Sequence, residues 1–118
     1  MNKEFDLEKR TLEFARRVRR FVKDLPKTLI NFDDAKQILR SSGSIGANYI
    51  EANESLSKKD FLMRIKIAKK EAKESRYWLL VLSIEEPQNL KKEAECLIQE
   101  AAELMNILGA IQRKSESF

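Results

Sequence analysis

Residues 90–111 read LKKEAECLIQEAAELMNILGAI, and their apolar residues recur in alternating steps of three and four. The residues on this spacing are Leu90, Ala94, Leu97, Ala101, Leu104, Leu108 and Ile111. In a helix this spacing places a narrow apolar stripe on one side, and such stripes pack against neighbouring helices. The stretch therefore predicts one helix of a bundle, and it does not by itself indicate a function.

Similar spacing extends over most of the chain and predicts four helices, at about residues 7–25, 32–53, 58–84 and 88–113. Asp6 and Ser57 are expected as N-caps, Pro26 ends the first helix, and Pro87 suits the first turn of the last. Short connections make successive helices antiparallel neighbours. The predicted fold is therefore all-α, an antiparallel up-down-up-down four-helix bundle formed by a single domain over residues 1–118.

The middle of the second predicted helix, residues 41–46, has the sequence SSGSIG and resembles a turn. Glycine inside a helix costs about 1 kcal/mol relative to alanine. The apolar register nevertheless continues from Ile38 through Ile45 to Tyr49. We therefore expect one continuous helix, in which the glycines allow another backbone to approach closely.

The composition excludes several classes of enzyme. Among its 118 residues the chain has no histidine, so the commonest general base and the Ser-His and Cys-His nucleophile arrangements are missing. No glycine-rich phosphate-binding loop occurs either. Glu51, Glu71 and Glu74 are a conceivable metal or acid/base cluster, but pairing with Arg40, Arg76 or solvent is the favoured interpretation. We expect a protein that is not an enzyme and holds no cofactor or metal.

The sequence also bears on location. No stretch approaches the roughly 20 apolar residues that span a bilayer, and the acidic N-terminal residues do not resemble a secretory signal. A cytoplasmic location with no membrane partner is the expectation. The single cysteine, Cys96, lies inside a helical pattern and is expected to be a small buried hydrophobic residue.

Charge is distributed unevenly along the chain, whose net charge is +4. Residues 58–76 carry eight basic and three acidic residues, a local +5, whereas residues 85–105 carry two and six, a local −4. The candidate nucleic-acid-binding residues are Arg16, Arg17, Arg20, Lys59, Lys66, Lys70 and Lys73. On one surface they would attract a phosphate backbone without reading sequence. An equally weighted alternative is that these charges pair with the acidic fourth helix.

Several apolar residues lie beside or beyond the predicted core stripes. They include Ile50, Ile98 and Met105, and leftover apolar surface in a soluble protein often marks an interface between copies. Tyr77 and Trp78 form an aromatic pair that suits base or ligand stacking, although packing in the core or an interface is favoured. The sequence therefore predicts a homo-oligomer.

A family resemblance rests on residues 42–52 (SGSIGANYIEA), Asp60-Phe61 and residues 67–79 (IAKKEAKESRYWL), with Leu25-Pro26-Lys27 before the second helix. Over about residues 8–113 the chain resembles the four-helix bundle proteins first associated with intervening sequences in bacterial 23S ribosomal RNA genes. That group includes the accessory variability determinants of diversity-generating retroelements.

The resemblance implies an antiparallel four-helix bundle that assembles as a homopentamer around a central channel. The retroelement members are basic and bind nucleic acid and a reverse transcriptase. By position, Asn48, Glu51, Glu71 and Glu74 match recurring polar places of the family, and we expect them to fix helix register and the subunit contact.

Two function classes remain. The first is a non-enzymatic homo-oligomeric bundle, a pentamer by resemblance, with a basic surface for low-specificity binding of RNA or DNA. The alternative is a protein-interaction scaffold for a partner such as a reverse transcriptase, with no direct role in nucleic-acid binding. A metal protein or enzyme built on the three glutamates is a distant third.

Overall fold

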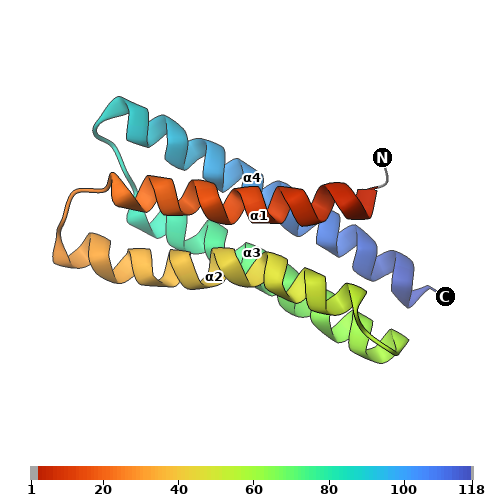
Figure 1. Cartoon of the computed structure of the whole chain (residues 1–118). Coiled ribbons are helices and arrows are strands. Elements are labelled where there is room, and N and C mark those ends of the chain that lie inside the picture. Colours follow the sequence, from red (N-terminus) through yellow and green to blue (C-terminus); the bar gives the residue numbers. More distant parts are fainter. Residues whose placement is uncertain (1–2, 118) are drawn as a thin grey trace.

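Four helices make up almost all of the computed structural model, which describes residues 3–117 and the side chains of residues 7–117. They are α1 (Lys3–Lys23), α2 (Leu29–Asn53), α3 (Lys58–Leu82) and α4 (Gln88–Glu116). No strand occurs within the described range. Successive helices run in opposite directions, with tight connections at alternate ends (Figure 1).

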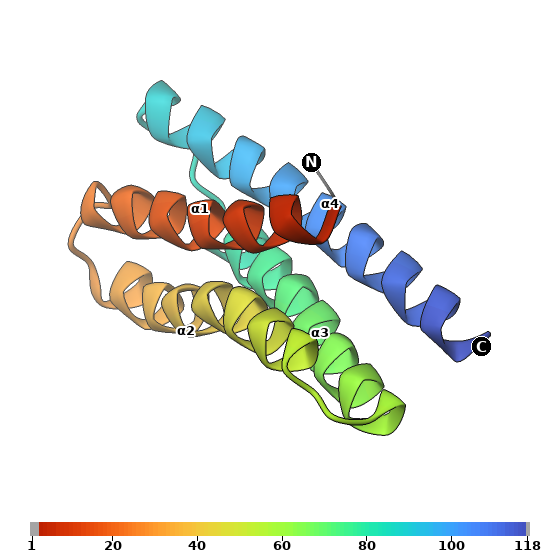
Figure 2. The ribbon, with the colours of Figure 1, turned by 45° about the vertical axis from the view of Figure 1, so that its right-hand side comes forward.

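Each helix contacts its two neighbours in a ring of four, and among the described residues the backbones of the diagonal pairs, α1 with α3 and α2 with α4, do not come within 8 Å between Cα atoms. Packing is most extensive between α2 and α3 and least between α1 and α4. Figure 2 shows α2 and α3 side by side near the connection that joins them. This arrangement confirms the predicted all-α up-down-up-down bundle.

The first two helices begin earlier than predicted. α1 begins at Lys3, so Asp6 lies inside the helix and is not its cap. α2 begins at Leu29, about three residues earlier than expected. Thr28 Oγ1 accepts a hydrogen bond from the Asn31 backbone N–H at 3.1 Å, which satisfies a free donor of the first turn.

The other helices follow the prediction more closely. The expected cap of α3 is confirmed, since Ser57 Oγ accepts from the Asp60 backbone N–H at 3.1 Å. α3 ends at Leu82, two residues before the predicted end, because Ser83 adopts a left-handed conformation with φ of 50°. α4 continues to Glu116, three residues beyond the predicted 113.

All four helices contribute to one core. The buried apolar residues of α4 are Leu90, Ala94, Leu97, Ala101, Leu104 and Leu108, as the spacing predicted, while Ile111 is half-buried. Facing them are fully buried side chains such as Phe14, Ile45 and Leu79. The prediction for Cys96 was wrong, because its neighbour Leu97 occupies the inward position and Cys96 is exposed.

The glycine-containing segment is helical, which confirms that α2 is continuous. Gly46 lies where α2 meets α1, and a Cβ added there would be 2.9 Å from Thr11 Oγ1 and 3.2 Å from Thr11 Cβ. At Gly43 the nearest such atom is a guanidinium nitrogen of Arg19 at 3.9 Å. Only Gly46 is therefore needed for the close approach of the two helices.

This difference predicts opposite effects for two matched substitutions. Gly46→Ala should lower the free energy of unfolding by about 1 kcal/mol, because the overlap with buried Thr11 outweighs the gain in helix propensity. Gly43→Ala should raise the free energy of unfolding by about 0.5–1 kcal/mol, since only propensity changes. Denaturant unfolding measures both, and equal stabilisation by the two alanines would contradict the close approach.

Candidate nucleic-acid interface

The outer face of α3 carries a row of exposed lysines. The inward positions of the helix are taken by small and aliphatic residues, including Ile65, Ala68 and Ala72. The lysines on the opposite side are Lys59, Lys66, Lys70 and Lys73, each exposed, in steps of seven, four and three residues. At 1.5 Å per residue the row is about 20 Å long. We refer to these four residues as the α3 lysine row.

Little negative charge faces this row. Within residues 7–117 the only ion pair of the row joins Lys66 Nζ to Glu116 Oε2 at 3.7 Å. Both side chains are about half exposed, and such surface pairs contribute roughly 0–1 kcal/mol. The charge of the α3 lysine row is therefore available to an external anion.

The candidate arginines of α1 are placed differently. Arg17 Nη2 donates to Glu93 Oε1 of α4 at 3.0 Å, and Arg20 Nη2 donates to Glu13 Oε1 of its own helix at 3.1 Å. Arg16 is exposed and makes no ion pair with any described side chain. The α1 arginines are thus partly engaged within the molecule.

Sequence reasoning missed the stronger contact between these two helices. Arg10 donates to Glu100 through Nε at 2.7 Å and through Nη2 at 2.8 Å, and Nη2 also donates to Glu103 Oε1 at 2.8 Å. These bonds raise the pKa of Arg10, and hydrogen bonds from Gln99 and then from Arg10 lower the pKa of Glu103. Three of the six glutamates counted in residues 85–105 thus pair with arginines of α1, namely Glu93, Glu100 and Glu103.

A signal for this contact was present in the sequence. Arg10 and Arg17 are seven residues apart, and so are Glu93 and Glu100. Residues seven apart lie on one side of a helix, so two matching rows of opposite charge favour two neighbouring helices. One of the two interpretations of the charge was that basic residues pair with the acidic fourth helix. Arg10 and Arg17 do so, through Glu100 and Glu93.

The seven candidate residues do not form one surface. Three lie on α1 and four on α3, and these helices occupy diagonal positions in the bundle. The glutamates of α4 face the arginines of α1 and therefore do not neutralise the α3 lysine row, in which only Lys66 forms an ion pair with a described side chain. Within one copy of the chain, the α3 lysine row is the more suitable anion-binding surface.

The predicted polar residues of α2 and α3 link these two helices. Arg40 Nη1 donates to Glu71 Oε2 at 2.8 Å, Nη2 donates to Glu71 Oε1 at 3.2 Å, and Nη2 also reaches Glu74 Oε2 at 2.8 Å. Burial raises the pKa of Glu71, but the hydrogen bonds and charge of Arg40, with help from Ser44, outweigh burial and lower it. Pairing with Arg40 was the favoured prediction for these glutamates, and it is confirmed.

Two serines extend this link into the core. The Oγ atoms of Ser41 and Ser75 lie 2.8 Å apart, and Ser75 Oγ donates to the backbone carbonyl of Glu71 at 2.9 Å. Both serines are fully buried. Across the described side chains no buried nitrogen or oxygen lacks a hydrogen-bond partner, so this polar cluster is satisfied within the molecule.

Asn48 makes a second link. Its Nδ2 donates to the Ser44 carbonyl at 2.8 Å, and its Oδ1 accepts from Arg64 Nη1 at 3.1 Å, a partner that the sequence did not reveal. Glu51 is exposed and does not approach Glu71, because the helix register places Glu71 beside the middle of α2. Nowhere in the described part of the chain do three or more metal-ligating side chains gather.

Tyr77 and Trp78 lie in different environments. Tyr77 is 58% exposed, whereas Trp78 is half-buried against the core. Their ring centroids are 5.2 Å apart with planes at 80°, an edge-to-face contact. Packing against the core therefore describes Trp78, whereas Tyr77 lies outside the core of one copy of the chain.

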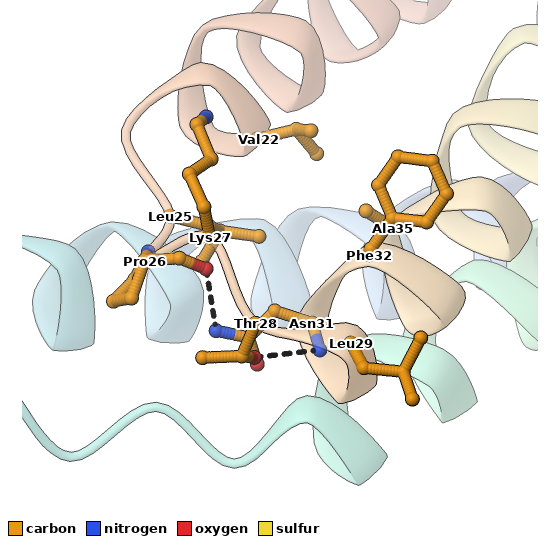
Figure 3. A pocket seen from close by; sticks show the side chains of 9 residues that line it. All are labelled: Val22, Leu25, Pro26, Lys27, Thr28, Leu29, Asn31, Phe32 and Ala35. Carbon is orange, nitrogen blue, oxygen red and sulfur yellow. Dashed lines mark hydrogen bonds between the residues drawn. The ribbon is translucent and has the colours of Figure 1, made fainter.

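An apolar hollow of about 430 Å³ lies at the connection between α1 and α2. Val22, Leu25 and Ala35 form part of its wall, and the strongly exposed Leu29 and Phe32 lie at its side (Figure 3). The hollow is on the α1–α2 side of the bundle and is separate from the α3 lysine row. None of the helices in the described range is both long and apolar enough to cross a membrane.

The family model described as 23S rRNA-intervening sequence protein matches residues 3–110. The crystal structure of a protein of unknown function from the S23 ribosomal protein family of Bacteroides thetaiotaomicron VPI-5482 is similar, with a TM-score of 0.82 and 34% sequence identity. The match covers 95% of this chain and 99% of that chain. Among curated proteins, none matches this sequence.

Proposed function

The chain belongs to the 23S rRNA-intervening sequence protein family, and from this premise we propose that it is a non-enzymatic, homo-oligomeric bundle that binds RNA or DNA with low specificity through α3. One observation carries the proposal. The α3 lysine row is exposed and almost unneutralised, while the glutamates of α4 face the arginines of α1.

The chemistry of the row determines the kind of recognition. Lysine presents a point charge on a flexible stem and does not read base edges in the manner of a bidentate arginine. Binding would come from neutralised phosphates and released counterions, which is independent of sequence. A non-enzymatic role is further supported by the lack of histidine. The cytoplasmic location stays a prediction.

Binding to unrelated sequences tests the low specificity. We expect two RNAs and one DNA of equal length but different sequence to bind with affinities within a few-fold of one another at the same salt concentration. Fluorescence anisotropy with the purified full chain measures this. Absence of binding to all three would remove the nucleic-acid proposal.

The oligomeric part of the proposal is supported by exposed apolar side chains. The largest exposed fractions belong to Leu29, Ile30, Phe32 and Leu56. Exposed apolar surface of this extent is typical of contact surfaces. Several copies of the α3 lysine row in one particle would also raise the affinity for a long polyanion. Light scattering should give a mass that is a multiple of 13.8 kDa, five-fold if the pentamer implied by the resemblance is correct.

A second candidate function is a scaffold for a protein partner such as a reverse transcriptase. The apolar hollow beside Leu29 and Phe32 favours it, because apolar pockets with exposed rims suit protein contacts. A pull-down from the native host separates the candidates. A stoichiometric protein that stays bound after nuclease treatment, together with no binding of pure RNA or DNA, would favour the scaffold.

A further inference from the structure

Tyr77 continues the α3 lysine row by one turn. It follows Lys73 by four residues and Lys70 by seven, the spacings that keep side chains on one side of a helix. The helical rise places its Cα about 6 Å beyond that of Lys73 along the axis. An exposed aromatic ring therefore lies next to the two lysines, neither of which forms an ion pair with a described side chain, while the nearby Glu74 is bonded to Arg40.

The ring of Tyr77 is held in place by its neighbour. Trp78 packs partly against the core and contacts Tyr77 edge-to-face, with centroids 5.2 Å apart. Such a contact restricts the tyrosine while leaving 58% of the residue exposed. A ring ordered before binding loses less conformational freedom when another ring stacks on it.

We propose that Tyr77 is a stacking platform for an unpaired base, so that the α3 surface prefers single-stranded RNA or DNA to a duplex. This inference rests on the proposed function. Bases of a duplex are already stacked on one another, whereas a single strand offers free ring faces. Lysines attract the phosphates of both forms, and the aromatic ring distinguishes between them.

Charge favours a nucleic-acid strand over a second copy of this chain on this surface. The exposed Lys70 and Lys73 would attract a partner rich in negative charge. The most acidic helix of the chain is α4, whose Glu93, Glu100 and Glu103 already contact arginines of α1. A phosphate backbone supplies the required charge at every nucleotide.

The test compares one oligonucleotide as a single strand and as a duplex, by anisotropy at fixed salt. The wild-type chain should bind the single strand more tightly. Tyr77→Leu should weaken single-strand binding about tenfold and leave duplex binding unchanged, because it removes only stacking. Tyr77→Phe should keep the wild-type affinity. Leu12→Ala, which removes a half-exposed apolar side chain from α1, should change neither affinity.

Intrinsic fluorescence gives a second readout, since Trp78 is the single tryptophan of the chain. The single strand should quench it in the wild type and in Tyr77→Phe. Unchanged binding by Tyr77→Leu, an equal loss for both nucleic-acid forms, or a change in assembly mass would each overturn the inference. If the wild type binds neither form, the proposed function fails as well; if binding depends on Lys66 and Lys70 alone, only the stacking platform fails.

Discussion

Lys66→Glu combined with Lys70→Glu is expected to weaken binding of RNA or DNA on the order of 100-fold, because two attractions become repulsions at the centre of the α3 lysine row. The dependence of log affinity on log salt should also become shallower by about two, one for each lost phosphate contact. Both lysines are exposed, and only Lys66 makes an ion pair, so the melting temperature should change little.

A charge-matched control separates a local effect from a general one. Lys9→Glu with Lys23→Glu changes the net charge equally, but both exposed residues lie on α1, diagonally across the bundle from α3. We expect this control to lose less than about fivefold in affinity, through the net charge alone. Equal losses in the two double variants would show that the α3 lysine row has no special role.

Arg40→Met is expected to have the largest effect on stability among single polar substitutions between α2 and α3. It leaves Glu71, whose side chain is only 7% exposed, without its main partner. Arg40 itself is half exposed, so the cost is smaller than for a fully buried pair, about 2 kcal/mol at pH 7. Denaturant unfolding measures it, and Glu71→Gln added to Arg40→Met should recover part of the loss.

The pH dependence of this effect has a definite sign. Arg40 lowers the pKa of Glu71 in the folded state, so the pair stabilises the fold above the ordinary glutamate pKa. That stability is lost as the pH falls through the lowered pKa, because the carboxylate is then protonated. The difference between the wild type and Arg40→Met should therefore shrink below about pH 4. A constant difference from pH 7 to pH 3 would contradict the role of the ion pair.

The fold was predictable because it depends on spacing. The stripe from Leu90 to Leu108 is buried as the period of the helix requires, and the register from Ile38 to Tyr49 correctly outweighed two glycines. The errors are local. α2 begins after Thr28, its N-cap, although Asn31 and Asp33, which also suit a cap, follow closely. Cys96 is exposed because the inward position is taken by the next residue, Leu97.

The candidate site was only partly predictable, because pairings between helices depend on which helices are neighbours. The α3 lysine row follows from spacing within one helix, and so does its exposure. That Arg10 binds Glu100 and that Arg64 binds Asn48 depends on the order and register of the helices. The order and register of the helices also explain why the expected approach of Glu51 to Glu71 does not occur. Glu71 lies beside Arg40 in the middle of α2, whereas Glu51 lies near the end of that helix.

The exposure of Tyr77 shows a further limit. An apolar run from Tyr77 to Leu82 resembles a core segment, yet only Leu79 and Leu82 are buried in it. The helix turns the intervening side chains outward at the end of α3, where no fifth helix covers them. Periodicity places a residue on a face, but the number of packed neighbours decides whether that face is covered.

The salt dependence of nucleic-acid binding by the wild-type assembly tests the central claim most directly. Affinity for one RNA should fall steeply as salt rises from 50 to 200 mM, with a linear relation between the logarithms of affinity and salt concentration. Such a slope is expected when lysines neutralise phosphates. Binding that does not change over this range, or no binding at 50 mM, would contradict a nucleic-acid interface on α3.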